Sequence, residues 1–210
     1  MDAVRVALLR EVLAGTDWLH DTRCFAGALR GSVARHRGGL LLVGSEEYEP
    51  WHLAAHLDDE AAWSDLPELS PTLVRHRVPP GAAAHLSVGL GRLEAVRRGE
   101  TLLVVAAEEP GAGLLERVSD ARRGGATVLA LDGAPDGAGA ELRALAHEAL
   151  PGLAGPEDPA AAVLDLDTVQ HLVSAAAGEN RLPAPGGRRR FRDRLARLAD
   201  QLTAPPPPRW

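Results

Sequence analysis

Three short apolar runs, each followed by a polar or glycine-containing loop, constrain the fold of this chain most strongly. They cover residues 40–43 (LLLV), 101–107 (TLLVVAA) and 127–131 (TVLAL). Each run is continuous rather than alternating, which is typical of a parallel strand buried on both faces. Weaker patterns over 72–77 and 147–150 predict two further strands.

Helical patterns fill the intervals between these runs, with apolar residues recurring at three- and four-residue spacing. The expected helices cover residues 2–14, 16–36, 50–63, 90–98, 113–123, 141–146 and 159–177. Alternating strands and helices predict an α/β domain whose parallel sheet is covered on both faces. Ligands of such sheets bind beyond the carboxyl ends of the strands. Those ends correspond here to residues 44–50, 107–113 and 132–137.

Composition excludes several classes of function. The chain has 210 residues and a net charge of −6, and all 23 of its basic residues are arginine. Without lysine, a Schiff-base enzyme and a Walker-type phosphate loop are excluded. The negative charge argues against a general nucleic-acid binder, and no apolar run approaches the roughly 20 residues that span a bilayer.

The single cysteine bears on location and packing. Cys24 has no partner for an internal disulfide, and the N-terminus shows no signal-peptide pattern. We therefore expect a cytoplasmic protein. Because Cys24 lies in a helical pattern, we expect it to be a small buried hydrophobic residue.

The C-terminal part differs in composition from the rest. Residues 178–187 are rich in glycine and proline and predict a linker, and 203–210 form a proline-rich tail. Between them, 188–202 predict an amphipathic helix with six arginines against two aspartates. Its stripe contains Phe191, Leu195 and Leu198, and Arg189 and Arg192 lie among its basic residues. This helix either packs within the protein or its dimer, or binds a separate protein partner.

Two blocks and a closing helix resemble the SIS (sugar isomerase) domain family. The blocks are residues 37–57, RGGLLLVGSEEYEPWHLAAHL, and 98–131, RGETLLVVAAEEPGAGLLERVSDARRGGATVLAL; the helix lies around VQHLVSAAAGE. The resemblance covers about residues 16–177 and makes 1–177 one SIS-like domain with N-terminal helices at 1–36. It implies a five-stranded parallel sheet flanked by helices, binding of phosphosugars and a homodimer.

The positions that hold phosphate in that family differ here. The hydroxyl and glycine positions of the second loop fall at Glu108, Glu109, Pro110 and Gly111, and the first loop reads Gly44-Ser45-Glu46-Glu47-Tyr48-Glu49. A carboxylate ~4 Å from a phosphate costs about 4 kcal/mol at an effective dielectric constant near 20, unless Arg75, Arg77 or a partner subunit compensates. We therefore expect a degenerate, non-catalytic, ligand-sensing or regulatory SIS-like protein that binds a carbohydrate derivative weakly. The candidate ligand-binding residues are Gly44, Ser45, Glu46, Tyr48, Glu108, Glu109 and Gly111.

Two alternatives remain open. One is a phosphosugar isomerase of the phosphoheptose type, with catalytic candidates Glu47, Glu108 and His52, because the acids of the two loops should converge at one sheet edge. The other is an interaction module that acts through the C-terminal arginine-rich helix.

His52 and His56 are separated by four residues on one expected helix face, which is metal-ligand spacing. They resemble the HxxxE pair of phosphoheptose-type proteins, some of which bind zinc, and Gln170 or His171 loosely matches the later ligands. The alternative is a pair of partly exposed helix histidines. We expect no cofactor, with zinc at His52 and His56 as the alternative.

Overall fold

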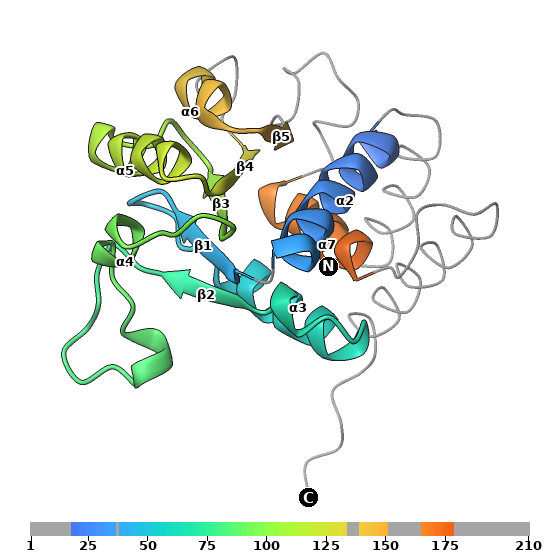
Figure 1. Cartoon of the computed structure of the whole chain (residues 1–210), viewed down its shortest axis with the longest axis horizontal. Helices are drawn as coiled ribbons and strands as arrows, with labels where there is room; N and C mark the ends of the chain where they lie inside the picture. The colour runs from blue at the N-terminus through green and yellow to red at the C-terminus, as the bar shows by residue number, and fades with distance from the viewer. Residues whose placement is uncertain (1–17, 37, 134–138, 151–164, 179–210) are drawn as a thin grey trace, which may run out of the picture.

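The computed structural model describes residues 18–36, 38–133, 139–150 and 165–178 (Figure 1). The predicted helix 2–14, the linker from residue 179 onward, the basic helix with its candidate contact residues, and the proline-rich tail lie outside these ranges. They remain predictions. No helix among the described residues is long and apolar enough to cross a membrane.

The five predicted strands form one all-parallel sheet, which confirms the α/β class. In chain order they are β1 (Leu40–Gly44), β2 (Pro71–Val74), β3 (Thr101–Ala106), β4 (Thr127–Asp132) and β5 (Glu148–Leu150). Their order across the sheet is β2-β1-β3-β4-β5. Leu40 is aligned with Pro71 on one side and Thr101 on the other, so the carboxyl ends of β1, β2 and β3 lie at one edge.

Helices cover both faces of the sheet (Figure 1). Three of them, α2 (Trp18–His36), α3 (Trp51–Trp63) and α7 (Leu166–Ala177), pack together on one face. The other face is covered by α4 (Gly91–Glu94), α5 (Ala112–Arg123) and α6 (Ala140–Leu145). Two short 3₁₀ helices flank β2 along the chain. The first, η1 (Pro67–Leu69), lies between α3 and β2, and the second, η2 (Ala84–Leu86), lies between β2 and α4.

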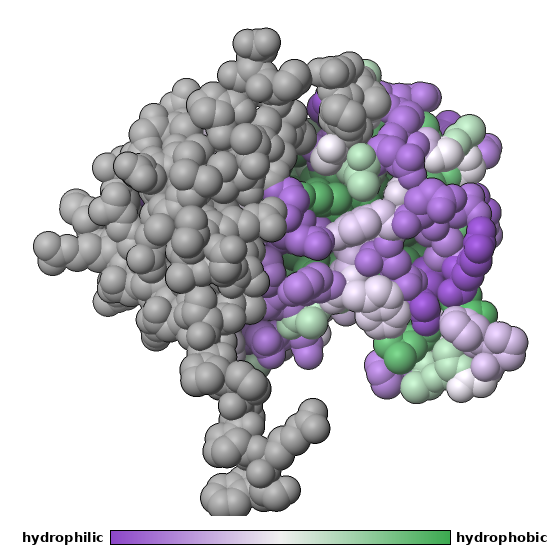
Figure 2. Space-filling model, turned by 180° about the vertical axis from the view of Figure 1, so that it is seen from behind, coloured by the Kyte–Doolittle hydropathy of each residue, from purple (hydrophilic) through white to green (hydrophobic). Residues whose placement is uncertain are grey.

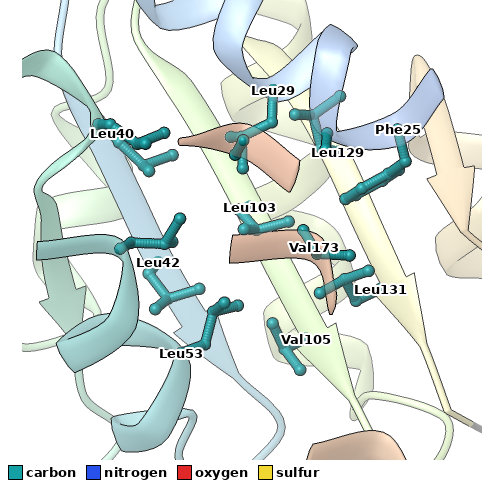
Figure 3. Packing of buried hydrophobic residues seen from close by; sticks show 14 of the residues in the cluster. Phe25, Leu29, Leu40, Leu42, Leu53, Leu103, Val105, Leu129, Leu131 and Val173 are labelled. Atoms are coloured by element: carbon teal, nitrogen blue, oxygen red, sulfur yellow. The ribbon is translucent and has the colours of Figure 1, made fainter. Parts of the chain in front are cut away.

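Alternate strand residues supply the two cores. Leu42, Leu103 and Leu129 point to the face of α2, α3 and α7, where they meet Leu29, Leu53 and Val173 (Figure 3). The intervening strand residues pack against α5 and its neighbours. Each fully buried leucine contributes about 1.5–3 kcal/mol, which explains why the continuous apolar runs specify strands covered on both sides.

The region around α4 differs from the prediction. β2 ends at Val74 rather than residue 77, since Arg75 makes only a single bridge to Gly89 and the following segment projects from the body (Figure 1). The helix expected over 90–98 is shortened to α4, because the backbone N–H of Arg97 donates to the carboxylate of Glu100 at 2.6 Å and forms a turn. Seen from behind, most of the described surface is hydrophilic, with apolar residues between the polar ones (Figure 2).

The expectation for Cys24 is wrong. Its side chain is exposed, and Sγ lies 3.4 Å from Nε2 of His20, one helical turn away. The buried face of α2 runs through Phe25, Leu29 and Val33. Cys24 is about 100° around the helix from Phe25, which places it on the solvent side.

Candidate functional site

A tight turn after β1 connects the sheet to α3. The N–H of Tyr48 donates to the carbonyl of Ser45 at 3.3 Å, and α3 begins at Trp51. A Cβ at Gly44 would collide with the carbonyl oxygen of Tyr48, so this position accepts only glycine without a shift of the loop. Gly44 therefore sets where Tyr48 and the first turn of α3 lie.

Two acids of this loop, Glu46 and Glu49, are paired with the two arginines that follow β2. Arg75 donates twice to Glu49, at 2.6 and 3.1 Å, and Trp51 Nε1 donates to the same carboxylate at 2.5 Å. The guanidinium of Arg75 also lies over the Trp51 ring, 4.7 Å from its centroid. Arg77 pairs with Glu46 at 3.0 Å, both side chains being well exposed. Both arginines that could balance a phosphate therefore already contact carboxylates.

Tyr48 connects this loop to α7. Its hydroxyl donates to Oδ1 of Asp167 at 2.8 Å and accepts from Nε2 of Gln170 at 2.6 Å. Burial raises the pKa of Tyr48 to about 12, with the hydrogen bond from Gln170 opposing and the bond to Asp167 reinforcing the shift. The phenol is therefore protonated at neutral pH and acts as the donor to Asp167.

Three histidines gather where α3 and α7 pack together. His52 and His56 lie on the first two turns of α3, and His171 lies on α7. The ring centroids are 5.0 Å apart for His52–His56, 4.6 Å for His52–His171 and 4.1 Å for His56–His171. One nitrogen from each ring lies within 4.8 Å of the other two. The predicted helical pair therefore gains a third member from a different helix.

Their surroundings keep two of these rings neutral at physiological pH. Burial, followed by the neighbouring His56 and His52, lowers the pKa of His171 to about 4. Burial and His52 also lower the pKa of His56. Neutral imidazole is the protonation state that binds a metal ion.

The donor set fits zinc or a similar ion. Three imidazole nitrogens with an open fourth position are a known zinc arrangement. Two nitrogens bound to one tetrahedral zinc lie about 3.3 Å apart, given Zn–N bonds of about 2.0–2.1 Å, so modest side-chain rotation would bring the three together. Nδ1 of His171 is buried and has no hydrogen-bond partner among the described residues, so it is available as a ligand atom.

The second predicted loop makes different contacts. α5 begins at Ala112 after Gly111, without a side-chain cap, and Glu108 is exposed. Glu109 accepts a hydrogen bond from the N–H of Gly139, near the start of α6, and partial desolvation together with the charges of Glu141 and Asp132 raises its pKa. Within the described ranges, no hydrogen bond or ion pair joins the acids of this loop to Glu46, Glu47 or Glu49. The two loops follow the neighbouring strands β1 and β3. The acids of the first loop interact with the segment after β2, whereas Glu109 of the second interacts with the start of α6.

Sequence reasoning did not identify two features of this edge. The first is the Tyr48–Asp167–Gln170 network, which no local motif signals. The second is the contact of His171 with the helical pair, for which the only signal was the loose match of VQH on the closing helix.

Comparison with known proteins supports the fold. No family model matches the sequence, and no curated protein matches it either. Among solved structures, a chain described as "Putative sugar binding protein" from Salmonella typhimurium LT2 superposes with a TM-score of 0.53 at 14% identity. The match covers 93% of this chain and 52% of the other, so this chain spans about half the length of that neighbour. At this identity the likeness shows a shared fold.

Proposed function

We propose that this chain is a degenerate SIS-like protein that binds a divalent transition-metal ion through His52, His56 and His171 and senses a carbohydrate-derived ligand beside it. The convergence of the three imidazoles carries this proposal. The SIS-like motifs and the fold shared with the chain described as a "Putative sugar binding protein" support the ligand class. A bound metal ion would offer its open coordination position to a hydroxyl or carbonyl oxygen.

The charges around the site favour a ligand without phosphate. Asp165 and Asp167 act electrostatically on His171, and Asp59 acts on His56. Arg75 and Arg77 are engaged by Glu49 and Glu46. A phosphate would therefore meet carboxylates whose charge is not balanced by a free arginine at the end of β2.

Metal binding is tested directly with Co²⁺ and Zn²⁺. We expect the full chain to bind one ion, to show tetrahedral Co²⁺ absorption bands, and to lose at least 100-fold in affinity when His52, His56 or His171 is replaced by alanine. The control is His85→Ala, because His85 is exposed, lies in the segment after β2 and is not a member of the cluster. Equal losses in the control, or no binding by the wild type, would contradict the proposal.

Ligand class is tested by thermal unfolding of the metal-loaded protein with matched sugars and sugar phosphates. A ligand at 100 times its Kd stabilises a protein by about 2.7 kcal/mol. We expect stabilisation by an unphosphorylated sugar derivative. Selective stabilisation by a phosphosugar would instead favour the phosphoheptose-type isomerase, and product formation from that phosphosugar would establish it.

A homodimer remains part of the proposal, by the family resemblance. Sedimentation velocity on the full chain tests it, and a monomer across the micromolar range would contradict it.

A further inference from the structure

The hydroxyl of Tyr48 lies between the two helices that carry the histidines. Tyr48 precedes the first residue of α3 by three positions, and His52 is the second residue of that helix. Asp167 and Gln170, which contact the hydroxyl, lie in the first turns of α7. His171 follows Gln170 directly and lies one helical turn beyond Asp167, on the same side of α7.

We propose that Tyr48 is a positioning residue that holds His171 at metal-binding distance from His52 and His56, a role that rests on the metal site of the proposed function. The hydroxyl joins the loop that starts α3 to the first turn of α7 through two hydrogen bonds. Those bonds fix the position of α7 relative to α3 along the direction of the helix axes. That displacement decides whether the third imidazole reaches the other two.

The contacts of Gln170 show that this connection is built rather than incidental. Its side chain is 1% exposed, and Nε2 donates both to Tyr48 and to the carbonyl of Leu166, the latter at 3.1 Å. Gln170 therefore attaches the phenol to the backbone of α7 itself. Two hydrogen bonds shorter than 3 Å at a protonated phenol give a defined geometry rather than a loose contact.

The loop side of the connection is equally constrained. A Cβ at Gly44 would lie 1.7 Å from the carbonyl oxygen of Tyr48, so the loop passes Gly44 closely. Pro50, the residue before α3, has a φ that its ring restricts. The backbone on either side of Tyr48 is therefore constrained, and the loop can shift little when the side chain moves. Loss of the hydroxyl would free α7 to shift while leaving the aromatic ring packed.

The test measures Co²⁺ affinity and the Co²⁺ absorption spectrum of the full chain. In Tyr48→Phe and Asp167→Ala, each of which removes the hydroxyl–carboxylate bond, we expect affinity to fall 10- to 100-fold and the tetrahedral bands to weaken, the range typical of groups that orient metal ligands. In Asp167→Asn, whose amide oxygen still accepts from Tyr48, we expect the band positions to be retained and affinity to fall less than fivefold.

The matched control is Ser70→Ala, which removes a hydrogen bond to Asp58 on the outer side of α3. We expect its spectrum and affinity to be those of the wild type. Thermal unfolding of the metal-free variants verifies that each one folds. If Tyr48→Phe does not fold, Asp167→Ala tests the same hydrogen bond. If the wild type binds Co²⁺ and both Tyr48→Phe and Asp167→Ala bind it with the same affinity and spectrum, the positioning role alone is overturned. A wild-type chain that binds no Co²⁺ would overturn the metal site and this role together.

Discussion

The carboxyl ends of β1 and β4 both carry buried polar side chains, but they differ in how these groups are satisfied. At β4, Asp132 has a fully buried side chain that accepts from Arg143 at 2.7 Å. The neighbouring Glu109 accepts from the N–H of Gly139. Protein groups thus occupy the acceptors at this end, which is what a structural element requires.

At β1, several buried atoms have no such partner. Oγ of Ser45, Oε1 of Gln170 and Nδ1 of His171 lack a hydrogen-bond partner among the described residues. An unsatisfied buried polar group costs about 1–3 kcal/mol, so three around one loop–helix junction are expensive for stability alone. If the proposed function holds, these atoms of the β1 end are retained for binding, whereas the paired groups of the β4 end stabilise the fold.

Arg143→Ala gives the largest expected effect and tests the structural side of this comparison. Removing Arg143 takes away its 2.7 Å ion pair with the buried carboxylate of Asp132, which costs about 3 kcal/mol. Urea unfolding should show this loss, with Co²⁺ affinity unchanged. A loss of metal binding without loss of stability would show that the two ends are not separate in role.

Gly44→Ala tests the turn on which the β1 end depends. The added methyl group collides with the carbonyl of Tyr48, so we expect a loss of about 2 kcal/mol and weakened Co²⁺ binding. Gly111→Ala is the matched control, since its φ of −60° suits alanine and no atom lies within 4 Å of the added Cβ. Equal stability of the two variants in thermal unfolding would argue against the constraint at Gly44.

The sequence predicted the sheet better than the site, for physical reasons. Continuous runs such as LLLV report burial on both faces, which is a local property of the chain. The end of β2 was missed because Arg75 leaves the ladder to pair with Glu49, a contact between separate segments. The prediction for Cys24 was wrong because a step of one residue turns the side chain by about 100° around the helix axis. A helical pattern over the segment therefore does not by itself show that Cys24 is buried.

The candidate site was predicted only in part. The spacing of His52 and His56 on one helix is visible in the sequence, as is the acidic character of the loop. The approach of His171 depends on how α7 packs against α3, and the pairing of Glu46 and Glu49 with arginines depends on the neighbouring strand. Such distances between elements are not encoded by spacing along the chain.

The metal-free protein should lose stability in mild acid. The pKa of His171 is about 4 in the folded protein, against an ordinary value near 6.5. Protons therefore bind the unfolded chain first, so this contribution is complete above about pH 6.5 and is lost as the pH falls toward 4. We expect a loss on the order of 1 kcal/mol, because partial exposure screens the effect. His171→Gln should flatten this part of the urea-measured profile, and an unchanged slope would contradict the assignment.

Ser45→Ala gives the smallest expected loss of stability and tests directly whether the β1 end serves binding. Ser45 is 3% exposed, and its buried hydroxyl has no hydrogen-bond partner in the described part of the chain. Its removal loses no hydrogen bond and relieves an unsatisfied buried group, so it should not lower the free energy of unfolding and should raise it by up to about 1 kcal/mol. Thr101→Val is the comparison, since it breaks a buried 3.0 Å hydrogen bond to Ser32 and should cost about 1 kcal/mol. If Ser45→Ala instead destabilises the metal-free protein as much as Thr101→Val does, the Ser45 hydroxyl stabilises the fold, and the contrast between the two strand ends fails at that residue. If its stability is unchanged or raised while its response to sugar ligands is lost, the hydroxyl is retained for binding.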